Sequence, residues 1–557
     1  MNEVKLKSES FLVEKQAHTN QESTSNIDFI TEGKASIFVP KENKVFYNPV
    51  QTFNRDLSVI VIRSWSKIFL KNKEIAIRKK YEKKEFKRQK ISHFCEETNK
   101  ISNKSSEKSN ITSPFSEKIE SNDLYLSNSL NQKRELCLPS FSILDAFSAT
   151  GIRAIRYIKE ISNVGNVVAN DFAKSAVEMI KKNCIHNNIT EKVKFNCEDA
   201  RFIMYQQIVQ KKCFDVIDID PYGTAAPFID GAIQCVSDGG LLCVTCTDLA
   251  VLAGGSYPEK CFANYGSMPF RHSVFCHEQA LRIVLYTIAS SAARYGRYIK
   301  PLLSVFADFY IRLFIKVDTS PYNVKFFHST SMMSYLCSGC HTFYNQPIGK
   351  TSPNKNPDTY KHFNSQGPII GPNCEFCGFK CHISGPMWSG PLHDKEFLID
   401  TLNIIDSESI DIYTTLPRMK GMLTIAETEL MDPFYYSPTH LSKILHCQTP
   451  SMKDISSALI NAGYSVSFTH ASPGSIKTNA PPKILWNIMR FWIKKYPVSE
   501  KRIRDGTVVK EILKIEPDTC IDFTLHQDIE KIFKHGFIKY QLNPIKNWGP
   551  KIKANGN

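Results

Sequence analysis

The sequence contains no run of about 18 apolar residues, the length that crosses a bilayer as a helix. Residues 1–26 are polar and lack the apolar core of a signal peptide. Acidic residues are in the minority, 55 against 70 Lys and Arg, so the net charge is +15. These absences predict a soluble, intracellular protein of the nucleus, the cytoplasm or both, with a mitochondrial pool left open. The positive charge suits a polyanion such as nucleic acid.

The sequence also gives no sign of a disulfide framework. Its 17 cysteines are an odd number and are spread through apolar runs such as Leu241–Cys246. That distribution indicates reduced thiols in a core and one metal cluster. A chain of 557 residues with 42% hydrophobic residues is long enough for two or three folded units.

A third absence is the Gly-x-Gly-x-x-Gly turn of dinucleotide-binding proteins, although strands and helices alternate from residue 141. A strand over 141–147 is followed by a loop with the single Gly151 and by a helix from Ile152 to Ile161. A strand bearing Asp145 and a turn with one glycine suit the zwitterionic end of a methionine better than a pyrophosphate. We expect Asp145 to hold the ammonium group and Arg153 the carboxylate.

The next predicted strands also end at acidic residues. Strand 166–170 is followed by Asp171, twenty residues past Gly151, at the spacing at which an acidic side chain binds both hydroxyls of a ribose. Strand 193–197 leads to Asp199, which could accept from an adenine amino group. Each acid alone could be a helix cap, but four at successive strand ends predict a nucleoside-bearing cofactor. The four are Asp145, Asp171, Asp199 and Asp220.

The turn Asp220-Pro221-Tyr222-Gly223 is the predicted reactive centre. It follows an apolar strand, and Pro221 ends that strand because it has no N–H. Asp220 is therefore expected at the carboxyl edge of the sheet, where α/β proteins bind ligands. The Asp220 carboxylate and the Pro221 carbonyl can each accept an N–H of a planar amine, and Tyr222 can stack on a base. A second interpretation stays open, in which Asp220 only caps the next helix.

Further along, strand 240–245 and a close pair of strands, 302–306 and 309–317, complete the predicted sheet. An antiparallel final pair on a parallel sheet is the usual methyltransferase topology.

Before the sheet, a helix with one apolar face is predicted from Leu57 to Phe69, with Asn54 as its N-cap. Arg55 would then lie at the helix start, where its charge opposes the helix dipole. An arginine at this position suggests a specific role, such as binding a carboxylate. The alternative interpretation is that its side chain is solvated.

A basic insertion follows this helix. Residues 71–90 contain ten Lys or Arg against three acidic residues, and residues 100–133 are rich in Ser, Asn and Lys. We expect the first part of 71–138 to prolong the helix as a charged rod and the rest to be disordered. An RNA contact, a nuclear address and a plain linker all remain open.

Two Cys-x-x-Cys pairs, 33 residues apart, predict a structural zinc site in the segment 330–385. Four thiolates close a tetrahedral site and leave no open position for catalysis. We expect the intervening loop, 345–372, to depend on the metal that fixes its ends. His341, Cys381 and His382 are alternative ligands, and the predicted ligands are Cys337, Cys340, Cys374 and Cys377.

The C-terminal region is predicted to be mostly helical, with helices near 397–406, 438–447 and 452–462. Strand 464–469 follows, so the order resembles a winged helix that grips RNA. His470 and Lys477 would lie on the wing.

Six segments resemble the tRNA (guanine26-N2)-dimethyltransferase family, and the resemblance spans nearly the whole chain outside the insertion. They are Val45–Asp56, Leu144–Arg153, Asp218–Gly223, Cys276–Arg282, Gly385–Gly390 and Thr469–Asn479. The resemblance implies an acidic catalytic residue at Asp220 and a C-terminal domain that helps hold tRNA. It also implies an S-adenosylmethionine site at Arg55, Arg153, Asp171, Asp199 and Ala200.

We therefore predict an α/β fold with a Rossmann-like, class I S-adenosylmethionine-dependent methyltransferase domain over 27–392. A smaller, mostly helical, winged-helix-like domain that binds tRNA would cover 393–545. The expected partner is tRNA, without a membrane or an obligate protein partner. Two rival functions remain: methylation of an amino group in ribosomal RNA or DNA, and a tRNA-binding or folding module without turnover.

Overall fold

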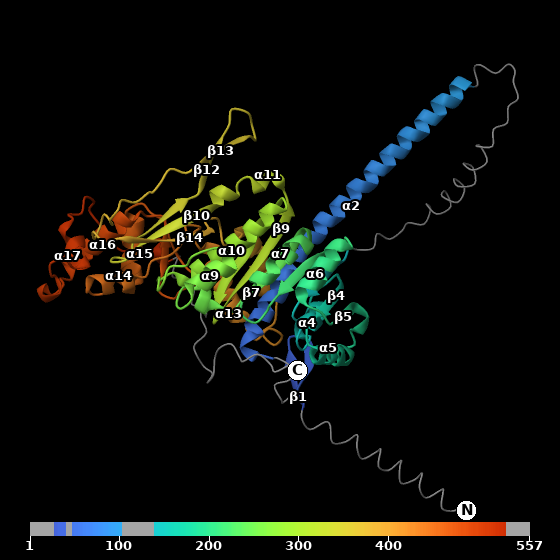
Figure 1. Ribbon diagram of the computed structural model, residues 1–557, viewed down its shortest axis with the longest axis horizontal. Helices are drawn as coiled ribbons and strands as arrows, with labels where there is room; N and C mark the ends of the chain where they lie inside the picture. The colour runs from blue at the N-terminus through green and yellow to red at the C-terminus, as the bar shows by residue number, and fades with distance from the viewer. Residues whose placement is uncertain (1–26, 41–46, 103–138, 531–557) are drawn as a thin grey trace, which may run out of the picture. The chain divides into compact units, whose positions relative to one another are not determined.

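The computed structural model describes residues 27–40, 47–102 and 139–530 (Figure 1). The chain divides into two compact units, residues 66–141 and the remainder. The predictions for residues 1–26, for 103–138 and for 531–545 lie outside the described residues. Among those described, no helix is long and apolar enough to cross a membrane.

The larger unit is built on a seven-stranded sheet. Its first five strands in spatial order are parallel, and β9 lies antiparallel between β7 and β8. This arrangement confirms the predicted Rossmann-like sheet with an antiparallel final pair. The spatial order is β5 (Val193–Asn196), β4 (Val164–Asn170), β3 (Phe141–Asp145), β6 (Phe214–Ile219), β7 (Val236–Cys246), β9 (Tyr310–Thr319) and β8 (Arg297–Ala307).

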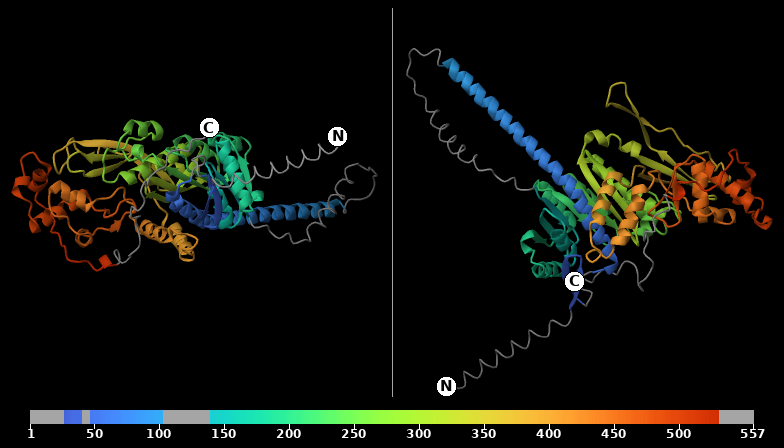
Figure 2. Two further views of the ribbon diagram at one scale, coloured as in Figure 1. Left: turned by 90° about the horizontal axis from the view of Figure 1, so that it is seen from below. Right: turned by 180° about the vertical axis from the view of Figure 1, so that it is seen from behind.

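Helices connect the strands and cover the sheet (Figures 1 and 2). Alternate residues of a strand face opposite sides, so Ile217 and Ile219 of β6 enter the main apolar core, while Asp218 faces the other way. The helices along this part of the chain are α4 (Ile152–Glu160), α5 (Lys174–His186), α6 (Ala200–Val209), α7 (Ala226–Cys235), α8 (Leu249–Leu252), α9 (Pro258–Tyr265) and α10 (Cys276–Arg294).

The chain enters the fold through a hairpin, β1 (Ile27–Glu32) and β2 (Ala35–Pro40), and a 3-10 turn, η1 (Pro49–Gln51). Helix α2 (Thr52–Ser102) starts directly after that turn. The prediction of Asn54 as an N-cap is therefore wrong. Asn54 lies inside the first turn of the helix, where its side chain donates to Gln51 Oε1 at 2.7 Å.

Residues 66–102 of α2 belong to the smaller unit and remain helical to Ser102. The first part of the basic insertion is thus a helical rod, as the charge pattern predicted.

The segment after the main sheet holds two short helices, α11 (Pro321–Val324) and η3 (Phe327–Thr330), and five strands. Three strands form a sheet of order β11-β10-β14, and the other two form a hairpin, β12-β13. The stretch 345–372 is therefore not simply a loop, as we had expected, because it contains this hairpin. The strands are β10 (Ser331–Cys337), β11 (Phe343–Pro347), β12 (Gly349–Pro353), β13 (Tyr360–Asn364) and β14 (Cys381–Trp388).

The C-terminal region is mainly helical, with one two-stranded sheet made of β15 (Val466–Phe468) and β16 (Ile476–Thr478). The helices and the small sheet match the predicted winged-helix-like order. The helices are α12 (Lys395–Asp406), α13 (Leu416–Thr428), α14 (Pro438–Leu445), α15 (Met452–Asn461), α16 (Pro482–Lys495) and α17 (Val508–Lys514), with the 3-10 turn η4 (Glu500–Arg502) before the last.

A buried cluster of charges joins this region to α10. Lys477 Nζ lies 3.1 Å from Glu278 Oε1 and 3.2 Å from Glu429 Oε1, and its side chain is 1% exposed. His470 Nδ1 lies 2.6 Å from Glu429 Oε2. Lys477 lies on β16 and His470 in the connection from β15, as predicted, but both side chains are buried against carboxylates and do not face RNA.

Burial raises the pKa of these carboxyl groups, but nearby cations more than offset it. Lys477 and Arg282 lower the pKa of Glu278, and His470 and Lys477 lower the pKa of Glu429. A carboxyl group with a lowered folded-state pKa stabilises the fold above its ordinary pKa, and that stabilisation is lost as the pH falls. The cluster therefore contributes most at neutral pH.

We predict that Lys477→Met lowers the free energy of unfolding by about 3 kcal/mol at pH 7, since it removes the cation that two buried carboxylates share, although Arg282 and His470 remain beside them. Urea unfolding measures this, with the exposed Lys453→Met as the matched control. The deficit should shrink as the pH falls toward 4, where both carboxyl groups of the variant become protonated. A variant as stable as the parent at pH 7 would contradict the assignment.

Candidate functional site

The acidic residues at the strand ends gather at one edge of the sheet. In the β3–β6 ladder Asp145 pairs with Asp218, and Asp220 follows two residues later. On the other side of β3, the backbone N–H of Asp171 donates to Asn196 O at 3.3 Å, which joins the ends of β4 and β5. The sequence therefore placed Asp145, Asp171 and Asp220 correctly at this carboxyl edge.

Asp145 is almost fully buried, and its Oδ2 atom has no hydrogen-bond partner among the described residues. Burial and the neighbouring Asp218 carboxylate raise its pKa to about 7. A buried carboxyl group with an unused oxygen is suited to bind a cationic group. The cation would stabilise the ionised carboxylate and would give the unused oxygen a hydrogen-bond donor. This agrees with the predicted role of Asp145 toward an ammonium group.

Arg153 projects from the first turn of α4 into the same edge. Its Nη2 donates to Asp220, and its Nη1 lies 3.4 Å from Asp218 Oδ2 and 3.2 Å from Ser58 Oγ. Burial alone would lower the pKa of the guanidinium, but the carboxylates of Asp220 and Asp218 raise it. Arg153 is therefore a permanent cation that is shared between two carboxylates.

Asp218 is a buried residue of this edge that the sequence reasoning did not single out. It is fully buried and accepts from Arg312 Nη1 at 2.8 Å and from the hydroxyl of Tyr157. Burial raises its pKa, yet Arg312 and Arg153 together lower it below the ordinary value. The signal was an acidic residue between the buried Ile217 and Ile219, which requires a buried cation elsewhere in the fold.

The turn that carries Asp220 is fixed from the neighbouring strand. Thr247, at the end of β7, accepts from Gly223 N through Oγ1 at 2.9 Å and donates its own N–H to Gly223 O at 3.0 Å. Gly223 has φ +78°, and a Cβ placed on it would meet nothing within 4 Å. Tyr222 is 45% exposed beside that open space. The turn thus presents the Tyr222 ring to solvent beside the partly exposed Asp220 carboxylate, while Pro221 is buried.

Asp220 is not a helix cap. The next helix, α7, starts at Ala226 and has Ala225 as its N-cap. The hydroxyl of Thr224 accepts from Ala226 N at 3.1 Å and contacts Tyr265 Oη at 2.6 Å. The capping interpretation of Asp220 is therefore wrong, and its side chain, 17% exposed, is paired with Arg153.

Asp171 and Gly151 shape the loop between β3 and α4. Gly151 has φ +80°, and a Cβ there would lie 3.1 Å from Ile180 Cγ2, so glycine is required. Asp171 accepts from Ala149 N and Ala173 N, both at 2.9 Å. Burial raises its pKa, and these two N–H groups counteract that effect. Each carboxylate oxygen retains a lone pair, so a ribose contact at Asp171 stays a prediction.

Asp199 is the N-cap of α6 and accepts from Arg201 N at 2.7 Å. It also pairs with the Arg201 side chain, which lowers its pKa. Ala200 is the first, buried residue of the same helix. The structure gives Asp199 a capping role, and the contacts of Asp199 and Ala200 with an adenine remain predictions.

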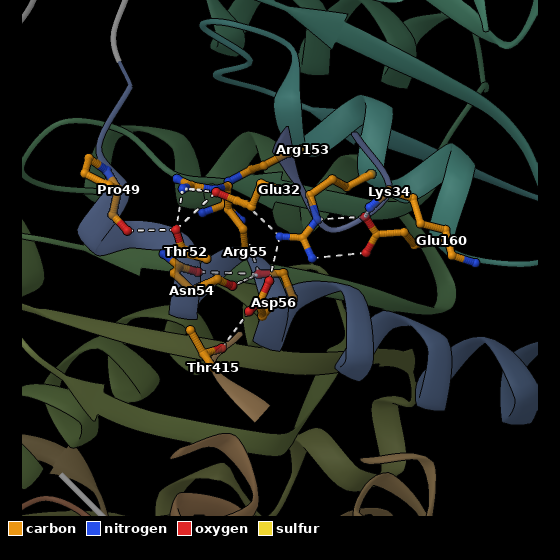
Figure 3. A network of polar contacts seen from close by, with 12 residues as sticks. Glu32, Lys34, Pro49, Thr52, Asn54, Arg55, Asp56, Arg153, Glu160 and Thr415 are labelled. Carbon is orange, nitrogen blue, oxygen red and sulfur yellow. Dashed lines mark hydrogen bonds and ion pairs between the residues drawn. The ribbon is translucent and has the colours of Figure 1, made fainter. Parts of the chain in front are cut away.

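Arg55 does hold a carboxylate, but one from its own chain (Figure 3). Its Nε donates to Glu32 Oε1 at 2.7 Å, its Nη2 lies 2.5 Å from Glu32 Oε2, and Nη1 and Nη2 both donate to Asn48 O at 3.2 Å. Burial raises the pKa of Glu32, but the neighbouring Arg55 and Arg156 outweigh that effect and lower the pKa of Glu32 to about 2. The charge that opposes the dipole of α2 is thereby neutralised, and a cofactor contact of Arg55 stays a prediction.

The four predicted zinc ligands come together. Their sulfur atoms all lie within 4.8 Å of one another, and none is in a disulfide. Tetrahedral coordination at Zn–S distances of about 2.3 Å places sulfurs about 3.8 Å apart. Cys337 Sγ lies 3.3 Å from Cys377 Sγ, and Cys340 Sγ 3.6 Å from Cys374 Sγ. The four thiols, without His341, Cys381 or His382, therefore fit a structural zinc ion.

The second cysteine pair is closed by a tight turn that ends at Gly378. Gly378, at φ +75°, donates its N–H to Cys374 O at 2.8 Å. On the other side, Trp486 Nε1 of α16 donates to Thr342 Oγ1 at 2.8 Å, and that hydroxyl lies 3.0 Å from Cys340 Sγ. The cysteine cluster is thus tied to the C-terminal helices.

Comparison with known proteins gives consistent matches. A family model described as N2,N2-dimethylguanosine tRNA methyltransferase matches residues 24–490. The tRNA (guanine(26)-N(2))-dimethyltransferase of Schizosaccharomyces pombe is 45% identical over 94% of this chain and 92% of its own. The human protein of the same name is 39% identical over 94% of this chain and 77% of its own.

Among solved structures, Trm1 from Pyrococcus horikoshii in complex with S-adenosyl-L-methionine superposes with a TM-score of 0.59. It is 25% identical in sequence, and the match covers 83% of this chain and 99% of that one.

We predict one zinc ion per chain. Cys374→Ser should abolish zinc binding and destabilise residues 330–390, because the metal joins two segments that are far apart in sequence. Elemental analysis and hydrogen exchange measure the two effects. Cys381→Ser, on the adjacent strand β14, is the control and should retain the metal. Metal-free parent protein with four reactive thiols in this segment would contradict the prediction.

Proposed function

Because the chain belongs to the N2,N2-dimethylguanosine tRNA methyltransferase family, we propose that it places two methyl groups on the 2-amino group of guanosine 26 in tRNA. The observation that carries the chemistry is the Asp220 carboxylate at the carboxyl end of β6, held in a turn by Thr247 beside the exposed Tyr222.

The residues at the sheet edge fit S-adenosylmethionine. The unpartnered Asp145 Oδ2 suits the ammonium group, and Arg153 suits the carboxylate. The half-buried Asp171, next to the glycine turn, suits the ribose. When bound, the cofactor supplies an electrophilic methyl group on a sulfonium ion.

The guanine 2-amino group is a weak nucleophile, since its lone pair is delocalised into the ring. Asp220 accepts one N–H and the Pro221 carbonyl accepts the other, so the lone pair is directed toward the methyl group. The N–C bond forms as the S–C bond breaks, and the nitrogen becomes cationic. Asp220 stabilises that charge and takes the proton, which passes to solvent because this side chain is partly exposed.

Arg153 links the cofactor site to the reactive turn, because the same guanidinium now pairs with Asp220. Its turn toward a cofactor carboxylate would release Asp220 for the amine while Asp218 remains its partner. Asp220 would thus be free to accept from the amine only when the cofactor is in place.

The second methylation uses the same carboxylate on an amine that already bears one methyl group. The open space beside Gly223 accommodates that group, since a Cβ there would meet no atom within 4 Å. The C-terminal region is proposed to help hold the tRNA. An intracellular location that includes mitochondria is also proposed, since the Saccharomyces cerevisiae relative, 41% identical, is named a mitochondrial enzyme.

We predict that Asp220→Asn binds tRNA and S-adenosylmethionine nearly as the parent does but transfers methyl groups at least about a hundredfold more slowly. The amide has one acceptor oxygen and no charge for the developing cation. Single-turnover rates at saturating cofactor, with mass spectrometry of the nucleosides, measure the loss. Asp215→Asn, at the amino end of the same strand, is the control. Near-parental dimethylation by Asp220→Asn would remove Asp220 from the mechanism.

We also predict that the cofactor product S-adenosylhomocysteine releases protons when it binds near pH 6. Asp145, with a pKa of about 7, is mostly protonated there and should ionise beside the ammonium group. Titration calorimetry in buffers of different ionisation enthalpy counts the protons. The release should disappear above pH 8.5 and in Asp145→Asn, whose affinity should fall. Equal release by the variant would show that another group titrates.

A further inference from the structure

The hairpin β12–β13, residues 349–364, extends away from the three-stranded sheet to which it is attached (Figure 1). All five residues of β13 are exposed. Tyr360 is 42% exposed and Phe363 is 51% exposed. Packing in a core does not explain aromatic side chains on a strand with both faces in solvent, so they point to an interaction surface.

The charge of this surface is positive. Residues 349–364 contain three lysines and one acidic residue, Asp358. The three lysines are exposed, and two further exposed lysines precede and follow the hairpin in the sequence, at 325 and 380. Lysines that alternate with exposed aromatic rings are the combination with which proteins follow a nucleic-acid backbone and stack on unpaired bases. The lysines of the hairpin are Lys350, Lys355 and Lys361.

The hairpin is held along its length by residues of the preceding segment, 322–328. His328 Nε2 lies 2.9 Å from His362 Nδ1, the rings of Phe326 and Tyr360 meet edge to face at 5.0 Å, and Tyr322 Oη donates to Asp358 O at 3.1 Å. The hairpin also lies in the sequence between the two cysteine pairs, whose thiols converge. Its lysines are therefore presented by a fixed element, which lowers the entropic cost of binding.

The sheet that bears the hairpin is joined to the reactive end of the fold. Gly385 of β14 exchanges two backbone hydrogen bonds of 3.0 Å with Met268, and the Ser384 hydroxyl donates to Met268 O at 2.6 Å. Met268 lies in the connection between β7 and α10, the same connection that starts with Thr247 beside Gly223. A substrate held by the hairpin would thus be held by a structure continuous with the reactive turn.

We propose that the hairpin surface, residues 349–364, is a tRNA-binding element. Its lysines contact phosphates, and Phe363 contacts an unpaired base or a ribose. The inference rests on the proposed function. The hairpin would supply basic side chains for tRNA in place of His470 and Lys477, which are buried in the charge cluster.

The test is the salt dependence of tRNA binding by Lys355→Ala/Lys361→Ala. Each lost phosphate contact should lower the slope of log affinity against log salt by about 0.9, so the slope should fall by nearly 2. Affinity should fall about tenfold or more near 0.1 M salt, and KM for tRNA should rise with kcat nearly unchanged. Phe363→Ala should weaken binding without changing the slope. Zinc content and the affinity for S-adenosylhomocysteine should be those of the parent.

The control is Lys192→Ala/Lys194→Ala, which removes two exposed lysines, one just before and one on the edge strand β5 of the main sheet. If both double variants lose tRNA affinity and slope equally, the loss reflects only the lower net charge, and the proposal is overturned. Parental affinity and slope in Lys355→Ala/Lys361→Ala would also overturn it and leave a protein partner for this surface. A parent protein that neither binds nor methylates tRNA would instead overturn the proposed function.

Discussion

The ion pair between Asp218 and Arg312 is the constraint on which the reactive edge depends. Both side chains are fully buried, on β6 and β9, the two strands on either side of β7. An unpaired charge there would cost several kcal/mol. With Arg312 on one oxygen, Asp218 offers the other to Tyr157 and Arg153. Arg153 is in turn oriented toward Asp220. The buried Asp218–Arg312 pair thereby fixes the direction in which the Arg153 guanidinium faces the partly exposed Asp220 carboxylate.

Features set by local sequence were predictable. Strand ends follow from apolar runs and Pro221, so the positions of Asp145, Asp171 and Asp220 followed without knowledge of the fold. The cysteine cluster was predictable for the same reason, since each pair is a local turn and four thiolates have one common geometry. The antiparallel final pair followed from two apolar runs that are close enough in the sequence to form a hairpin.

Features that depend on distant partners were not predictable in the same way. Arg55 was flagged by its helix position, but its partner Glu32 lies on another element. Lys477 read as an exposed basic residue because Glu278, 199 positions away, is invisible from the local sequence. Asp199 shows the reverse case, in which a residue singled out for a ligand also serves as an ordinary N-cap. The hairpin β12–β13 was missed because its Pro, Asn and Gly content resembles that of a loop.

The cysteine cluster has a consequence for how the chain can be divided. The four thiols share one apolar core with Leu445, Ile455 and Trp486 of the C-terminal helices. A chain truncated after residue 392 would keep the cysteines but lose most of the surface that buries them. A fragment that ends there would expose the four cysteines and Phe376, the buried members of this core that precede residue 392, and would tend to aggregate. The smallest separable piece with an intact reactive edge therefore retains both the cysteine segment and the helices that follow it.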